Sequence, residues 1–167
     1  MTITDFTFPQ IQYIVLSWFS VILAICGTFI VFREYRKLRA QPLIYLALIL
    51  IFLIPYNITH GLLFLVGFEN ESIMILLFRV QMIFLFIVVF FLVFFIESLR
   101  ADKPSPFILM VLGLGLGNGL VFVVIPGSVE FSLEIGPYLS DFARIIFGID
   151  LICLTFLLSI RISRFKS

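Results

Sequence analysis

The sequence predicts an all-α polytopic membrane protein: one bundle of five transmembrane helices, with the N-terminus outside and the C-terminus in the cytoplasm. Three observations lead to this fold class. The 167-residue chain is 62% hydrophobic and only 13% charged, whereas soluble domains carry about 25% charged residues. Five apolar runs reach the length of about 20 residues that a spanning helix needs. The acidic and the basic residues lie in different linkers.

The five runs are separated by polar or proline-containing linkers. REYRKLRAQP follows the first run and ends in Pro42, and the short acidic GFENES follows the second. ESLRADKPSP follows the third run and contains two prolines, which end helices. PGSVEFSLEIGP follows the fourth run and is framed by prolines and glycines. Residues 1–167 are therefore predicted to form one membrane domain. Its expected helices are 11–32, 43–66, 73–96, 107–125 and 138–160.

The orientation follows from the basic residues, which concentrate on the cytoplasmic side of membrane proteins. If the helices alternate in direction, the first linker, the third linker and the C-terminal tail share one side. These three segments carry Arg33, Arg36, Lys37, Arg39, Arg100, Lys103, Arg161, Arg164 and Lys166. The other side carries no Lys or Arg, and its acidic residues are Asp5, Glu69, Glu71, Glu130 and Glu134. The chain is thus expected to be a multi-pass protein of the cell membrane.

Polar side chains inside the predicted spans are the candidate functional residues. A charge in the hydrocarbon region usually faces a partner or a wet cavity, because it is costly to leave in lipid. Counted at about 1.5 Å per residue, these side chains fall at middle or outer depth. We expect an outer-half polar cluster that either binds a ligand or consists only of buried pairs. Its members are Asn57, His60, Arg79, Gln81, Asn118, Asp141, Arg144 and Asp150.

Arg79 is the cation in this set that most needs a partner. Two acids of the last predicted helix, Asp141 and Asp150, lie at a depth that Arg79 can reach. Such a pair would hold the third helix against the fifth. Arg144 shares a helix face with Asp141 and can also extend towards the outer headgroups. Sequence alone leaves open whether these residues form structural pairs or contact a ligand.

The sequence carries no pattern typical of an enzyme, a cofactor site or a metal site. His60 is the only histidine, so it cannot supply bis-histidine haem ligation or a His-rich zinc site. Cys26 and Cys153 lie in apolar runs without a C-x-x-C spacing, and we interpret them as small core residues. No nucleophile–base pair or carboxylate pair has a recognisable spacing. No catalytic residue, cofactor, metal or nucleic-acid partner is expected.

The run LGLGLGNG in the fourth predicted helix contains four alternating glycines. Gly113 with Gly117, and Gly115 with Gly119, form two small-xxx-small pairs. In lipid such pairs let a neighbouring backbone approach closely. Packing within the bundle is the simpler interpretation, and a homodimer through Gly113, Gly115, Gly117 and Gly119 is the alternative.

The order of these features resembles the N-terminal seven-helix sensor region of prokaryotic histidine kinases. A basic linker leads through proline into an apolar second helix, and a short acidic loop follows. The third helix carries Arg79-Val-Gln81 near its start, similar to the [RK]-x-Q of that region. It ends in Phe94-Phe95-Ile96-Glu97, similar to the recurring F-x-x-E. Only five helices are present and no output domain follows, so the resemblance implies a shortened, stand-alone relative.

Three functions remain open on the sequence. The first is a sensory or receptor-like module that binds a small or amphipathic ligand and signals to a cytoplasmic or membrane partner. The second is a non-catalytic membrane subunit or assembly protein whose polar residues only hold helices together. The third is a transporter, because intramembrane charges also mark solute paths. The absence of an obvious inverted repeat among the five runs counts against a transporter.

Overall fold

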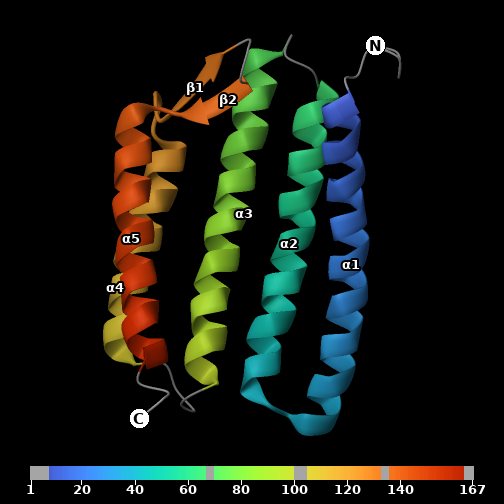
Figure 1. Ribbon diagram of the computed structural model, residues 1–167, viewed down its shortest axis with the longest axis vertical. Helices are drawn as coiled ribbons and strands as arrows, with labels where there is room; N and C mark the ends of the chain where they lie inside the picture. Colours follow the sequence, from blue (N-terminus) through green and yellow to red (C-terminus); the bar gives the residue numbers. More distant parts are fainter. Residues whose placement is uncertain (1–7, 67–69, 100–104, 133–135, 164–167) are drawn as a thin grey trace.

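The computed structural model describes residues 8–66, 70–99, 105–132 and 136–163, and within them the chain forms five helices (Figure 1). They run up and down the long axis of the molecule, with the two termini at opposite ends. The predicted helical bundle is thereby confirmed. The helices are α1 (Phe8–Leu38), α2 (Gln41–Val66), α3 (Glu71–Ser98), α4 (Pro106–Val124) and α5 (Asp141–Ser163).

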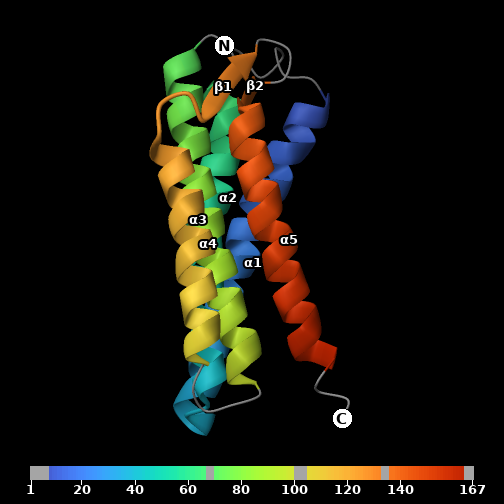
Figure 2. The same cartoon turned by 90° about the vertical axis from the view of Figure 1, so that its left-hand side faces the viewer.

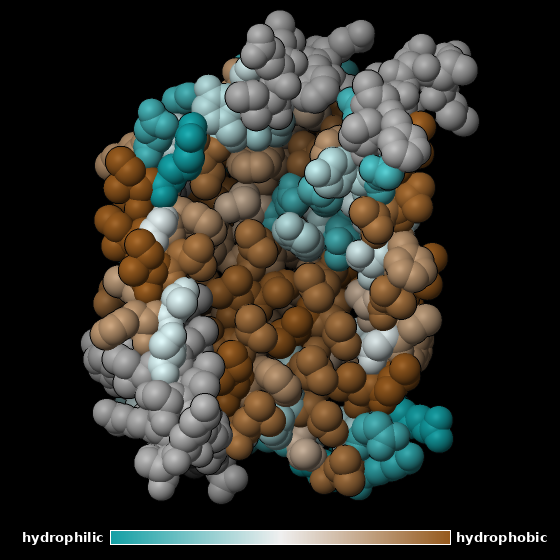
Figure 3. Space-filling view, in the orientation of Figure 1, coloured by the Kyte–Doolittle hydropathy of each residue, from teal (hydrophilic) through white to brown (hydrophobic). Residues whose placement is uncertain are grey.

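Three of the described helices are long and apolar enough to cross a membrane. They are Gln10–Leu38 of α1, the whole of α2 and the whole of α3, with 29, 26 and 28 residues. A hydrophobic band covers the middle of the molecule, and hydrophilic residues gather towards its two ends (Figure 3). Large apolar side chains such as Phe29, Ile152 and Phe156 are exposed. Such a surface suits lipid and not water.

Helix α1 extends six residues further than the sequence predicted. Its last two turns contain Arg33, Glu34, Arg36 and Lys37, which were expected in a linker. Arg, Lys and Glu are good helix formers, and Nζ of Lys37 lies 3.0 Å from Oε1 of Glu34 one turn before. The helix ends where Arg39 adopts a left-handed φ of 52°. The N–H of Arg39 donates to the carbonyl of Tyr35, which closes the last turn.

A small β-hairpin follows α4, in a segment where the sequence predicted only a linker. Strands β1 (Val129–Ser132) and β2 (Gly136–Leu139) pair antiparallel, with Glu130 opposite Tyr138. The predicted start of the last helix at residue 138 is therefore wrong, because Tyr138 and Leu139 belong to β2. The alternation of apolar and polar residues in Val-Glu-Phe-Ser was the available signal for a strand. The prediction of a purely α-helical chain needs this correction.

The helices form two unequal groups. Helices α1, α2 and α3 stand side by side, and α4 and α5 pack at the α3 end of this row (Figure 1). The contacts of α2 with α1 and α3 are extensive, whereas those of α4 with α3 and α5 are sparse. Helix α5 diverges from the rest towards its C-terminal end (Figure 2). The hairpin covers the end of the bundle where α3 and α5 begin.

The contact between α3 and α4 depends on one glycine. A Cβ added at Gly119 would lie 2.5 Å from Cε1 of Phe86, so only glycine lets this buried ring fit. At Gly113 and Gly117 an added Cβ would meet nothing within 4 Å. At Gly115 it would make ordinary contact with Asp150 at 3.9 Å. The hypothesis that all four glycines pack within the bundle is wrong, because Gly113 and Gly117 face outward.

Candidate functional site

Six of the eight polar residues expected in one outer-half cluster lie as pairs in three separate places, and Asn57 and Arg79 belong to none of these pairs. His60 and Gln81 join α2 to α3, and Asp141 and Arg144 lie under the hairpin. Asp150 and Asn118 line a cavity among α3, α4 and α5. The structure therefore brings these residues together in pairs. Helix rotation, which depth along the sequence does not specify, separates the pairs from one another.

His60 and Gln81 form a hydrogen-bonded pair between α2 and α3. Nε2 of Gln81 lies 2.8 Å from Nδ1 of His60, within hydrogen-bond distance. Gln81 is 7% exposed, and rings of Tyr13, Tyr56 and Phe64 pack around the imidazole at 5.3–6.3 Å. The pair satisfies two polar side chains in an apolar interior, which is the usual arrangement for buried polar groups.

The side chain of Asn57 forms a hydrogen bond within its own helix, α2. Its Nδ2 donates to the carbonyl of Leu53 at 2.8 Å. Thr59 likewise donates to carbonyl oxygens of Pro55 and Tyr56, both at 2.9 Å. These bonds satisfy the side chains of Asn57 and Thr59 within the stretch of α2 around Pro55, whose ring removes one helical hydrogen bond. Asn57 thus contributes to the proline-containing stretch of α2 and does not join His60 in a site.

Arg79 does not pair with either acid that the sequence suggested. Its Nη2 donates to the carbonyl of Ile125 at the end of α4, at 3.4 Å. Its Nε is buried without a hydrogen-bond partner among the described residues. Met82 lies one turn after Arg79 on α3, and it belongs to the apolar core with Phe86.

Asp141 and Arg144 pair with each other at the start of α5. Nη2 of Arg144 lies 3.2 Å from Oδ1 of Asp141, and Nε of Arg144 donates to the carbonyl of Leu139 at 2.7 Å. The guanidinium also lies over the ring of Tyr138, 5.5 Å from its centroid. The side chain of Asp141 is 91% exposed, so the pair lies at the surface. Arg144, through Leu139 and Tyr138, links β2 to α5.

Tyr138 and Glu130 complete this hairpin network. They are directly opposite each other on β2 and β1. The Tyr138 hydroxyl donates a hydrogen bond to the Glu130 carboxylate, and this bond is the main cause that raises the pKa of Tyr138 above its usual value of 10.0. The charge of Arg144 acts in the opposite direction. The network joins the two strands of the hairpin to the start of α5 at the surface.

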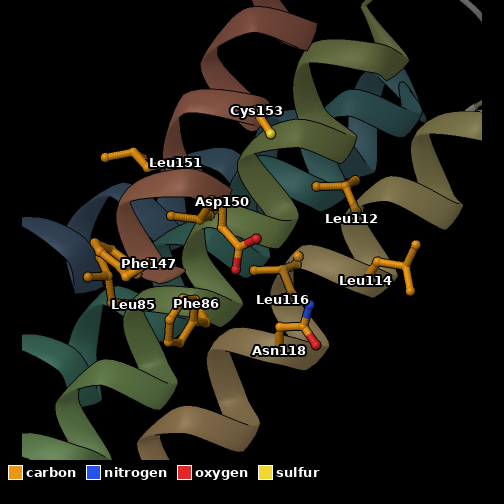
Figure 4. Close-up of a pocket in the computed structure, with 12 residues that line it drawn as sticks. Leu85, Phe86, Leu112, Leu114, Leu116, Asn118, Phe147, Asp150, Leu151 and Cys153 are labelled. Atoms are coloured by element: carbon orange, nitrogen blue, oxygen red, sulfur yellow. The ribbon is translucent and has the colours of Figure 1, made fainter. Parts of the chain in front are cut away.

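The third place is a cavity of about 360 Å³ between α3, α4 and α5 (Figure 4). Its volume falls within the range of about 300–1,000 Å³ that small-molecule sites occupy. The wall is apolar except for a few residues. Three elements supply it: Leu85, Phe86 and Val89 from α3, Leu112, Leu114, Gly115, Leu116 and Asn118 from α4, and Phe147, Asp150, Leu151 and Cys153 from α5. We call it the α3–α5 cavity.

Asp150 is the charged residue of this wall. Figure 4 shows its carboxylate pointing from α5 towards α4, where Leu116 and Asn118 lie. Oδ2 of Asp150 is buried and has no hydrogen-bond partner among the described residues. A buried carboxylate oxygen without a partner is costly. An unsatisfied acid in an apolar cavity is the feature that most strongly points to a ligand.

The remaining lining residues were not predicted as site residues. Leu and Phe line cavities and packed cores alike, so their sequence offers no signal. Cys153 lines the cavity and Cys26 lies on α1, and both are exposed. The prediction that they are core residues is wrong, because lipid accepts a small apolar side chain as readily as the interior does. No three His, Cys, Asp or Glu side chains in the described part of the chain are placed to hold a metal ion.

Comparison of the chain with protein-family models, with curated proteins and with solved structures found no match.

Proposed function

We propose that the chain is a five-span protein of the cell membrane that acts as a sensory or receptor-like module. Helices α4 and α5 have 19 and 23 residues, lengths that suit a span of about 17–25. Arg33, Arg36 and Lys37 lie at the end of the bundle where the C-terminus also lies, and Glu71 and Glu130 lie at the opposite end. This separation supports a cytoplasmic C-terminus and an outside N-terminus.

The orientation is tested by cysteine labelling in intact cells, in a variant that lacks Cys26 and Cys153. A cysteine at Glu130 should react with a membrane-impermeant maleimide from outside. A cysteine at Lys37 should react only after the membrane is opened. Outside labelling at Lys37 would contradict the whole arrangement. Several other residues of the charge pattern, Asp5, Glu69, Arg100, Lys103, Glu134, Arg164 and Lys166, lie outside the described residues.

The unsatisfied carboxylate of Asp150 in the α3–α5 cavity is the observation that carries the receptor function. The ligand site proposed here lies deeper than an outer-half cluster and uses Asp150 and Asn118 of that set. Sparse contacts of α4 and α5 with the rest of the bundle support a response by helix movement. An occupant between α3 and α5 would shift the cytoplasmic end of α5 and so signal to a partner. The resemblance to a kinase sensor region is consistent with this role.

A screen of small amphipathic molecules tests the receptor function. Thermal unfolding of the protein in lipid nanodiscs is the readout, and compounds that bind the folded protein raise the midpoint. Gly115→Leu places a side chain beside Asp150 and should abolish the effect. Gly117→Leu is the matched control on the same helix, because its position faces open space. Compounds that stabilise Gly115→Leu equally would place the ligand elsewhere.

A non-catalytic subunit or assembly protein remains the second candidate, and the exposed apolar face of α5 favours it. Phe142, Ile145, Ile149, Ile152 and Phe156 are each at least half exposed. A partner helix on this face would cover them and could fill the cavity with its own side chain. Outward-facing Gly113 and Gly117 would equally suit a second copy of the chain. Photo-crosslinking from position 152 in native membranes distinguishes these partners from lipid by the mass of the product.

A further inference from the structure

We propose that the α3–α5 cavity binds an amphipathic amine, whose protonated nitrogen contacts Asp150 and whose apolar part lies among the Leu and Phe side chains. This inference rests on the proposed receptor function and names the ligand class of the same site. It concerns molecules that combine one cation with one apolar group of moderate size.

The charge of the ligand follows from what Asp150 lacks. Oδ2 is buried and unpaired, and both nearby arginines are engaged elsewhere: Arg79 with the carbonyl of Ile125, Arg144 with Asp141. Neither of the salt bridges between described side chains involves Asp150. A ligand ammonium offers charge and up to three N–H donors. An anionic group would be repelled, and a neutral hydroxyl would supply a single donor.

The shape of the cavity leaves room for this group beside the acid. Gly115 lies opposite Asp150, and the nearest approach of an added Cβ to the carboxylate would be 3.9 Å. Any larger residue there would occupy the space that a headgroup needs. Asn118 adds a second polar group to the wall. The rings of Phe86 and Phe147 pack edge to face at 5.6 Å and offer an apolar surface for a chain or a ring.

The mouth of the cavity opens to the outer surface of the bundle. Leu114, Leu151 and Cys153 line the cavity and are also exposed. This surface belongs to the apolar face that we assign to lipid. A molecule that partitions into the bilayer would therefore reach Asp150 sideways, between α4 and α5.

Cys153 makes the proposal directly measurable. Alkylation of Cys153 by N-ethylmaleimide, followed by peptide mass spectrometry in nanodiscs of neutral lipid, reports whether the cavity is occupied. Cys26 on α1 is the internal control. The probes are 4-phenylbutylamine, 4-phenylbutanol and 4-phenylbutyrate, which share one apolar group and differ in the head. The amine should protect Cys153 at about tenfold lower concentration than the alcohol, the acid should not protect it, and Cys26 should react unchanged.

Two variants separate the ligand class from the existence of a site. Asp150→Asn keeps the shape and should remove the preference for the amine. Gly115→Leu should remove protection by amine and alcohol alike, whereas Gly117→Leu should protect as the wild type does. If all three probes protect Cys153 equally, and this protection is lost in Gly115→Leu, the proposed preference for an amine is wrong. The proposed receptor site is then still supported. No protection by any probe, with unchanged alkylation of Gly115→Leu, would overturn both.

Discussion

The row α1–α3 and the pair α4–α5 have a similar apolar composition but differ in how far their polar side chains are hydrogen-bonded. In the row, Gln81 meets His60, and Ser17 and Thr28 donate to carbonyls one turn before them at 2.8 and 2.7 Å. In the pair, Oδ2 of Asp150 is unsatisfied and Asn118 is exposed at a cavity, while Nε of Arg79 is the described exception in the row. Asp150 differs from Arg79 in that its unsatisfied oxygen belongs to a side chain that lines a cavity, which makes Asp150 the candidate for function.

Close packing accounts for the first half of this contrast. A Cβ added at Gly61 would lie 3.5 Å from Cβ of Ser17 and from Nε1 of Trp18. Small residues thus let α1 and α2 approach, and the rings of Tyr13 and Phe64 stack at 5.1 Å. Between α3 and α4 a comparable approach occurs at Gly119. Away from Gly119, α3, α4 and α5 pack less closely, and the α3–α5 cavity lies between them.

The largest expected effect comes from breaking the contact that joins the two groups. Gly119→Ala would place a methyl group 2.5 Å from the ring of Phe86 and should lower the free energy of unfolding by about 3 kcal/mol. Unfolding by dodecyl sulfate in mixed micelles measures the change. Gly117→Ala is the matched control and should be neutral or slightly stabilising, because alanine favours helix. Equal effects at both positions would show that α4 is rotated differently.

The second prediction is a substitution that should stabilise the fold. Asp150→Leu removes an unsatisfied acid from an apolar cavity and should raise the free energy of unfolding by about 2 kcal/mol. The same assay applies. Asp141→Leu loses only an exposed ion pair on the same helix. It should change the free energy of unfolding by less than about 1 kcal/mol. A loss of stability in Asp150→Leu would mean that the carboxylate has a structural partner.

In the row α1–α3, removing one partner of the His60–Gln81 pair should destabilise the fold. Gln81→Leu leaves His60 unsatisfied and should cost about 1 kcal/mol in the free energy of unfolding. The double variant His60→Leu with Gln81→Leu should cost less than the sum of the single changes, because neither leaves an orphaned group. Strictly additive costs would show that the two side chains do not interact.

The smallest effect concerns the hairpin network. The ionisation of Tyr138 is followed as the difference between the absorbance titration of the wild type and that of Tyr138→Phe. The Tyr138 hydroxyl should ionise above pH 10, because Glu130 raises its pKa. Glu130→Gln should bring that pKa back towards 10. Since the folded state holds this proton more tightly, the contribution to stability is present below pH 10 and is lost as pH rises through the folded pKa. An unchanged titration in Glu130→Gln would contradict the hydrogen bond.

The sequence by itself determined the helical bundle and, to within a few residues, most of the helix ends. Long apolar runs bounded by prolines and polar residues leave little choice, because a backbone in lipid must satisfy its own hydrogen bonds. The exceptions have local causes. Basic residues extended α1 to Leu38, and cross-strand pairing of Glu130 with Tyr138 delayed the start of α5.

Only the tertiary structure decided which polar residues meet. Depth along a helix can be counted in residues, but the rotation of each helix depends on how all its side chains pack. Arg79 and Asp150 looked like partners at reachable depth, yet Arg79 bonds to Ile125 and Asp150 faces a cavity. Gly119 packs against Phe86 while Gly117, two residues before it, faces outward. A difference of two residues turns a helix by about 200°, and no composition or motif records that angle.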